Sequence, residues 1–172
     1  RVWGVAVLNF LRSLLWHAWA IVTLVPYATV CVVLSIFIRG APMYWICRVW
    51  MWLAVHGARI ICGVQWREHG RENLPDGPAL RCPQHQAAWE TLAFTVVCPK
   101  PLSFVFKREI LYIPFFGWAI GRLDMVHIDR SRRTEAWAKV LKQGQALMAR
   151  GNWVIMFPEG TRIERGQKGD CK

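Results

Sequence analysis

An uncharged, apolar segment near the front of the chain most constrains how this protein can fold. Residues 13–38 contain no Asp, Glu, Lys or Arg, and Arg12 and Arg39 bracket the segment. At about 1.5 Å per residue, a helix of this length crosses the roughly 30 Å hydrocarbon core of a bilayer. A cleavable signal peptide has a shorter apolar region, so the segment predicts an uncleaved membrane anchor. We expect Pro26, in its middle, to kink the helix or to turn it back.

A second apolar segment, residues 43–64, differs from the first because charged residues interrupt it. It carries three tryptophans and three polar side chains, namely Trp45, Trp50, Trp52, Arg48, His56 and Arg59. We expect a helix in the plane of the membrane interface, with indole rings at headgroup depth and arginines reaching lipid phosphates. The alternative is a buried helix whose tryptophans face a protein core. Residues 1–62 are therefore predicted to form N-terminal membrane-anchoring helices.

Composition limits what the remaining residues can form. The chain has 172 residues and a formal net charge of +11. This length suits one domain with its own core, which we place at residues 63–172, behind the anchor. The charge suits an anionic membrane surface, and the lack of a nucleic-acid-reading motif argues against nucleic acid as a partner. None of the six cysteines forms a Cys-x-x-Cys pair, so the sequence predicts neither a metal site nor a disulfide framework.

Beyond Gln65, short apolar runs alternate with helical patterns, which is typical of an α/β domain. The strand candidates are residues 79–82, 102–106, 125–128 and 153–157. Between the last two, apolar residues recur at helical spacing, and Thr134 can cap that helix. We therefore expect a mixed central sheet flanked by helices and preceded by the helical anchor.

His85 and Glu90 can form a general base. Residues five apart on a continuous helix are separated by about 140° and would not share a face. His85 must therefore lie in the turn before a helix, after Pro83, so that Glu90 on the first turns can reach back to the imidazole. Glu90 would fix the tautomer and stabilise the imidazolium while the other ring nitrogen takes a proton from a substrate hydroxyl. Taken alone, the pair also fits a structural hydrogen bond.

A second polar group follows the last strand candidate, in the stretch Phe157-Pro158-Glu159-Gly160-Thr161-Arg162. Gly160 permits a backbone conformation denied to other residues. Thr161 offers a hydroxyl and Arg162 a planar guanidinium, and both suit a phosphate monoester. We expect Glu159 to hold Arg162 or a substrate hydroxyl rather than phosphate. The alternative is a strand-to-loop turn with a solvated Glu and Arg.

Together these two stretches resemble the motifs of the glycerophospholipid acyltransferase family, over roughly residues 65–168. Much of the family has Asn-His-x4-Asp where this chain has Gln84 and Glu90, and the box at 157–162 matches at all six positions. The stretch 121–130 is similar to the family's middle motif, and by that correspondence Arg130 is a second phosphate ligand. Lys107, after an apolar strand candidate, is assigned to the same substrate-binding set.

The resemblance implies a membrane-bound acyltransferase, closest to bacterial enzymes that convert 1-acylglycerol-3-phosphate to phosphatidic acid. Its implied partners are lysophosphatidic acid and a donor, acyl-CoA or acyl-ACP (acyl carrier protein), with no metal or tightly bound cofactor. The implied location is the bacterial inner membrane, with the catalytic domain on the cytoplasmic face.

Two other functions stay open. One is a sister acyltransferase acting on another lysolipid or on glycerol-3-phosphate, and the other is a non-catalytic membrane-binding module. The family has a further motif, an apolar strand with Val-Pro, after the box at 157–162, and this chain ends before it. We therefore expect a catalytic domain truncated at its C-terminal end.

Overall fold

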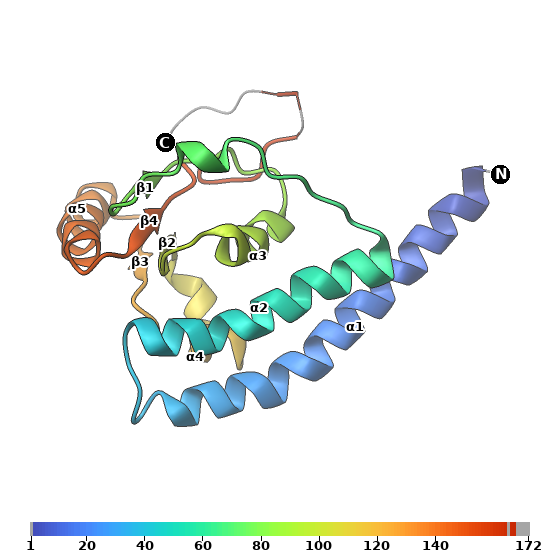
Figure 1. The fold of residues 1–172 in the computed structure, drawn as a ribbon, viewed down its shortest axis with the longest axis horizontal. Coiled ribbons are helices and arrows are strands. Elements are labelled where there is room, and N and C mark those ends of the chain that lie inside the picture. Colours follow the sequence, from blue (N-terminus) through green and yellow to red (C-terminus); the bar gives the residue numbers. More distant parts are fainter. Residues whose placement is uncertain (1, 165, 168–172) are drawn as a thin grey trace.

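A pair of long antiparallel helices forms one side of the molecule. The computed structural model describes residues 2–164 and 166–167. Helix α1 (Val2–Leu34) and helix α2 (Ala41–Cys62) lie side by side, and the α/β part of the chain packs along them (Figure 1). Helix α2 ends at Gly63, whose φ of 71° is the left-handed conformation that glycine adopts without steric cost.

Helix α1 continues through Pro26 to Leu34, so the predicted reversal at the proline does not occur. The chain turns back only after this helix, before Gly40. Contacts with α2 hold α1 along its length: the Trp16 indole donates to Ala54 O at 3.0 Å, and the Tyr27 hydroxyl donates to Ile46 O at 2.7 Å. Among the described residues, α1 is the one helix long and apolar enough to cross a membrane by length and composition.

Helix α2 combines both predicted arrangements of its tryptophans. The Trp50 side chain is buried, whereas Trp45 and Trp52 are exposed. We expected Arg48 to reach lipid phosphates, but its side chain turns into the protein. Its guanidinium donates to the carbonyls of Thr95, at 3.0 Å, and Val96. These are orphan carbonyls at the end of a neighbouring helix, and a cation stabilises that end.

The α/β part has the predicted fold class. Four strands, β1 (Leu80–Arg81), β2 (Leu102–Lys107), β3 (Val126–Ile128) and β4 (Trp153–Ile155), form one sheet in the order β1-β4-β2-β3. The strands are connected through helices α3 (Ala88–Val97), α4 (Phe116–Ile120) and α5 (Arg133–Ala149), and short 3-10 turns form η1 (Arg71–Asn73) and η2 (Arg108–Tyr112).

All three strand pairings in the described part are parallel, where we expected a mixed sheet. The connections explain this difference. A helix follows each of the first three strands and returns the chain to the same edge, so the next strand runs in the same direction.

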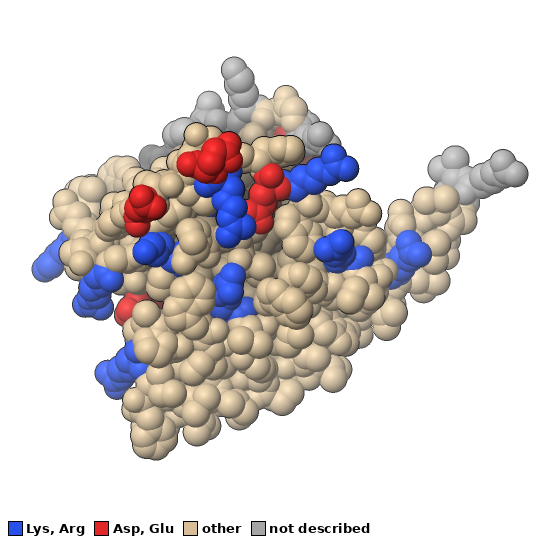
Figure 2. Space-filling model, viewed as in Figure 1, with Lys and Arg blue, Asp and Glu red and all other residues tan. Residues whose placement is uncertain are grey.

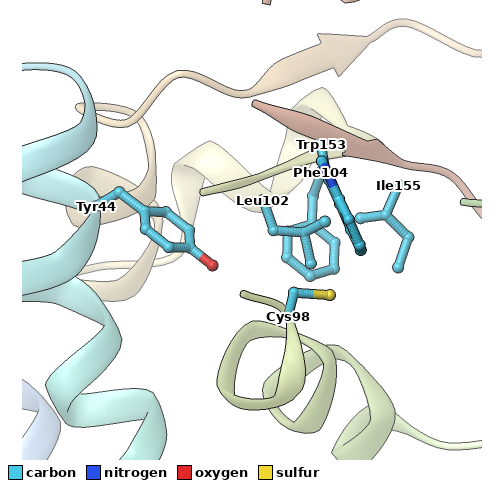
Figure 3. Packing of buried hydrophobic residues seen from close by; sticks show 6 residues of the cluster. All are labelled: Tyr44, Cys98, Leu102, Phe104, Trp153 and Ile155. Carbon is cyan, nitrogen blue, oxygen red and sulfur yellow. The ribbon is translucent and has the colours of Figure 1, made fainter. Parts of the chain in front are cut away.

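Side chains alternate between the two faces of the sheet. On β4, Val154 packs against α5, together with Val126, Val140 and Leu147. Trp153 and Ile155 point the other way, into a cluster with Leu102, Phe104, Cys98 and Tyr44 (Figure 3). Because Tyr44 belongs to α2, the helix pair contributes directly to the core of the α/β part.

Helix α5 begins at Arg133, so its N-cap is Arg132 and not Thr134 as predicted. Thr134 lies inside the first turn and makes no side-chain cap hydrogen bond, while Arg132 occupies the cap position. Asp129 instead orders the preceding turn by accepting from the Ser131 backbone at 3.0 Å and the Ser131 hydroxyl at 2.6 Å. Asp and Ser form such turns readily, which explains why a Thr cap is not needed here.

Candidate active site

A cavity of about 570 Å³ lies between α2, α3, α4 and the carboxyl end of β2. Ligands of open parallel sheets usually bind beyond the carboxyl ends of the strands, and this cavity is at that position. Six of the eight predicted site residues line it, namely His85, Lys107, Arg130, Gly160, Thr161 and Arg162. The structure therefore brings together residues from four separate stretches of sequence.

His85 lies in the turn before α3, as its spacing from Glu90 predicts. Ala87 is the last non-helical residue, with extended backbone angles, and Glu90 follows on the first turn. The Glu90 carboxylate oxygen Oε2 lies 3.3 Å from His85 Nδ1 and accepts from the Gln86 backbone N–H at 2.9 Å. One carboxylate thus holds both the imidazole and the start of the helix, much as in a capping box.

Two further contacts position the His85 residue. Its ring stacks on Phe157, with centroids 4.1 Å apart and an interplanar angle of 28°. Its backbone carbonyl accepts from Ile163 N at 2.8 Å. Nε2 has no hydrogen-bond partner among the described residues, so it is the ring nitrogen available to a molecule in the cavity.

The loop after β4 supplies the cationic part of the cavity. Gly160 has a φ of 64°, the left-handed conformation expected of it, and its N–H closes a turn on Phe157 O at 3.0 Å. Arg130 donates to Gly160 O and ties this loop to the end of β3. Thr161 and Arg162 are exposed on the cavity wall, where a ligand can reach both.

Hydrogen bonds also order the turn that contains Arg130. The Ser131 hydroxyl, and then the Ser131 backbone N–H, lower the pKa of Asp129 by hydrogen bonding to its carboxylate. This turn presents Arg130 to the cavity. Lys107, at the end of β2, forms an exposed ion pair of 3.1 Å with Glu109, and such pairs open easily to admit an anion.

Glu159 is placed differently from the other predicted residues. It is 9% exposed and does not line the cavity, and its Oε2 has no hydrogen-bond partner among the residues that the structure describes. No ion pair with Arg162 is present in the described part of the chain. The predicted contact between these two side chains is therefore not formed.

The sequence indicated only one apolar wall of the cavity, because the aromatic stretch 114–118 can line an acyl channel or pack in a core. Tyr44, Cys47, Arg48 and Met51 of α2 line it, although α2 was expected either to lie in the membrane interface or to turn its tryptophans toward a core. The opposite wall comes from α3 and α4, through Leu92, Phe116 and Ile120. A helical pattern shows which face is apolar but not which element that face will meet, so no signal in the sequence identifies the residues of α2 and α3.

Comparisons with known proteins identify the same region. The family model described as Acyltransferase matches residues 65–172. The 1-acyl-sn-glycerol-3-phosphate acyltransferase of Pseudomonas aeruginosa is 44% identical over 123 residues, which cover 72% of this chain and 46% of that protein. The Escherichia coli protein of the same name is 34% identical over 89 residues, which cover 50% of this chain and 35% of that protein.

More distant relatives carry a similar name. The mouse 1-acyl-sn-glycerol-3-phosphate acyltransferase alpha is 28% identical over 110 residues, which cover 63% of this chain and 39% of that protein. The chain thus spans less than half the length of these relatives. No solved structure gives a significant match. The matched region contains the His85–Glu90 pair, the end of β3 and the loop after β4, and so this chain belongs to the acyltransferase family.

Proposed function

We propose that the protein transfers a fatty acyl group from acyl-ACP or acyl-CoA to the sn-2 hydroxyl of 1-acylglycerol-3-phosphate, which gives phosphatidic acid. The observation that carries this proposal is the composition of one cavity. Its polar part contains His85, which Glu90 holds from behind, together with Arg130 and Arg162, and much of its remaining wall is apolar. A lysophospholipid has the same division between a phosphate head and an acyl chain. The names of the relatives support this choice of acceptor.

The His85–Glu90 pair supplies general-base catalysis. Nε2 takes the proton of the acceptor hydroxyl while its oxygen attacks the thioester carbonyl carbon, and Glu90 stabilises the resulting imidazolium through Nδ1. The carbon–sulfur bond then breaks, and the imidazolium returns the proton to the leaving thiolate. The products are the new ester and the free thiol of the donor, and the pair is restored.

The cationic loop binds the acceptor's phosphate. Arg162 donates two parallel hydrogen bonds, Thr161 adds a hydroxyl, and Lys107 contributes positive charge from the end of β2. Arg130 supports the phosphate through a second guanidinium and through its bond to Gly160 O. Gly160 shapes the loop, and Glu159, buried behind it, is available to a substrate hydroxyl if the loop opens.

The apolar walls bind an acyl chain. They come from α2, α3, α4 and β2, through side chains such as Met51, Leu92, Phe104, Phe116 and Ile120. Burial of apolar surface stabilises such a chain by about 25 cal/mol per Å² removed from water. Because α2 forms part of this wall, the helix pair contributes to substrate binding as well as to attachment.

We place the protein at the bacterial inner membrane, with the α/β part on the cytoplasmic side, where the acyl donors are made. Helix α1 exposes apolar residues along much of its length, among them Phe10, Leu14, Val22 and Val33. The α/β part packs along the helix pair rather than at one end of it (Figure 1). That packing favours a pair lying in one leaflet, because a spanning α1 would place α4 within the hydrocarbon.

The direct test is acyl transfer by the full-length protein and its His85→Ala variant. Loss of a general base costs about 100- to 10,000-fold in rate. His69→Ala is the matched control, because His69 is an exposed histidine outside the cavity and its loss should leave the rate unchanged. If His85→Ala keeps more than about a tenth of the rate, His85 is not the base. A wild-type protein that binds vesicles without turnover would indicate the non-catalytic alternative.

A further inference from the structure

The segment of residues 110–121, which includes the end of η2 and all of α4, has two apolar sides with different surroundings. Residues 110–121 contain no charged side chain. On the inner side, Ile110, Phe116 and Ile120 line the cavity. On the outer side, Tyr112, Ile113 and Trp118 are exposed, and Trp118 keeps 51% of its surface in contact with solvent.

Steric constraints hold this division in place. Phe115 has a φ of 61° and a ψ of −62°, and Phe116 N donates to Pro114 O at 2.7 Å, so Phe115 is the centre of a strained γ-turn. A Cβ atom on Gly117 would lie 2.3 Å from Ile110 O, so α4 packs on η2 without room for a side chain. Strain of about 1–3 kcal/mol persists only where the surrounding structure imposes it, and it marks segments with a function.

Other residues of this segment and its flank pack against the helix pair. Phe115, Ala119 and Leu123 pack with Ala28 and Cys31 of α1. Figure 2 shows that the surface over the C-terminal half of α1 carries no charged side chain on the face in view. The apolar exterior of α1 is thus joined by direct packing to the segment that bears Trp118.

Basic residues flank the segment at both ends. Arg108 precedes it and Arg122 follows it, and both side chains are exposed. Aromatic and aliphatic side chains bordered by arginine are the composition of a surface that rests in the headgroup region of an anionic bilayer. An exposed apolar surface of this kind on the α/β part indicates a binding partner. Its position beside α1 favours lipid over protein as that partner.

We propose that Tyr112, Ile113 and Trp118 form a second membrane-contacting surface, separate from α1, which inserts into the lipid interface. The proposal rests on the membrane attachment argued above. Since the inner side of the same segment lines the cavity, this contact places one cavity wall at the lipid surface. A lysolipid then reaches the site along the bilayer rather than through water.

Tryptophan fluorescence provides a test that does not depend on catalysis. The full-length protein is bound to phosphatidylethanolamine–phosphatidylglycerol vesicles whose acyl chains carry bromine, which quenches nearby indoles. Trp118→Phe is compared with Trp137→Phe, because Trp137 on α5 has a similar exposure of 55% but lies on the opposite side of the sheet. The emission lost in Trp118→Phe should be the quenched component, and the emission lost in Trp137→Phe should be unquenched.

Kinetics then separate lipid contact from structural damage. Ile113→Gln with Trp118→Gln should lower the rate on vesicle-borne lysophosphatidic acid by at least about fivefold. The rate on a short-chain, monomeric acceptor should stay unchanged, as should both rates in the control, Trp137→Gln with Leu141→Gln. Equal loss on both acceptors would mean that the surface is structural. A Trp118 emission that aqueous iodide quenches and brominated lipid does not would overturn the proposal, whether or not the protein is active.

Discussion

His85 shows how single residues are positioned in this site. Its side chain is held by Glu90 and Phe157 and its backbone by Ile163. The contact with Glu90 could be predicted, because helix geometry determines where a residue five positions later must lie. The contacts of Arg48 could not, because its partner Thr95 is 47 positions away and is brought close only by tertiary packing.

The two arginines proposed to bind the acceptor's phosphate should differ in their effects. Arg162→Lys removes only the planar fork, so we expect the Michaelis constant for lysophosphatidic acid to rise about 10- to 200-fold and that for the acyl donor to change little. Arg130 also donates to Gly160 O, so Arg130→Lys should in addition lower the melting temperature. Steady-state kinetics and calorimetry of both variants measure the difference. Equal weakening of both substrates would indicate that these arginines bind the membrane.

Two cysteines near the sheet should differ in reactivity. Burial raises the pKa of Cys98, although the nearby Arg81 charge opposes the shift, so its thiol stays protonated at neutral pH. Cys82 is exposed. Iodoacetamide should therefore label Cys82 and spare Cys98 in the folded protein, and both should react after denaturation. Mass spectrometry of peptides from the two samples measures this, and labelling of Cys98 in the folded state would contradict it.

Among the elements, α3 depends on contacts at both of its ends. Glu90 holds its first turn and Arg48 of α2 binds its last carbonyls. The strand positions could be predicted to within two residues from runs of apolar residues. Their order could not, because β4 inserts between β1 and β2 through pairing that no local pattern encodes.

Arg48→Met should destabilise the protein by about 1.5–3 kcal/mol, since it removes charge-assisted hydrogen bonds but keeps most of the side-chain length. Denaturant unfolding in detergent measures this change. Arg59→Met on the same helix is the control, because Arg59 is exposed and its guanidinium lies over the Trp66 ring, 5.9 Å from the ring centroid. If both variants lose the same stability, Arg48 acts through its general charge and not through α3.

At the scale of the whole molecule, the helix pair and the α/β part form one packed body. Tyr44 lies in the core of the sheet and Met51 lines the cavity, although both belong to α2. The sequence indicated the apolar character of residues 1–62 and favoured the membrane as its surroundings, with a buried second helix as the alternative. Hydropathy cannot distinguish a side chain that faces lipid from one that faces the protein's own core.

We expect the protein to remain in the membrane fraction after a wash with about 1 M salt, because salt screens charges but does not weaken apolar insertion. Sedimentation followed by immunoblotting measures the retained share. A variant with Arg108→Gln and Arg122→Gln serves as the electrostatic comparison and should be retained equally after the wash. Release of the wild-type protein by salt alone would show that attachment is electrostatic.

The strand order also has a consequence for synthesis on the ribosome. β1 pairs with β4, and their partners Leu80 and Val154 are far apart in the chain. A nascent chain that has emerged through α5 therefore holds β1 without a neighbour, while α1 has already been available to the bilayer. At about 5–20 residues per second, the time between the synthesis of β1 and the synthesis of β4 is several seconds. Early insertion of α1 into the membrane would keep the unpaired edge of β1 away from other nascent chains until β4 is synthesised.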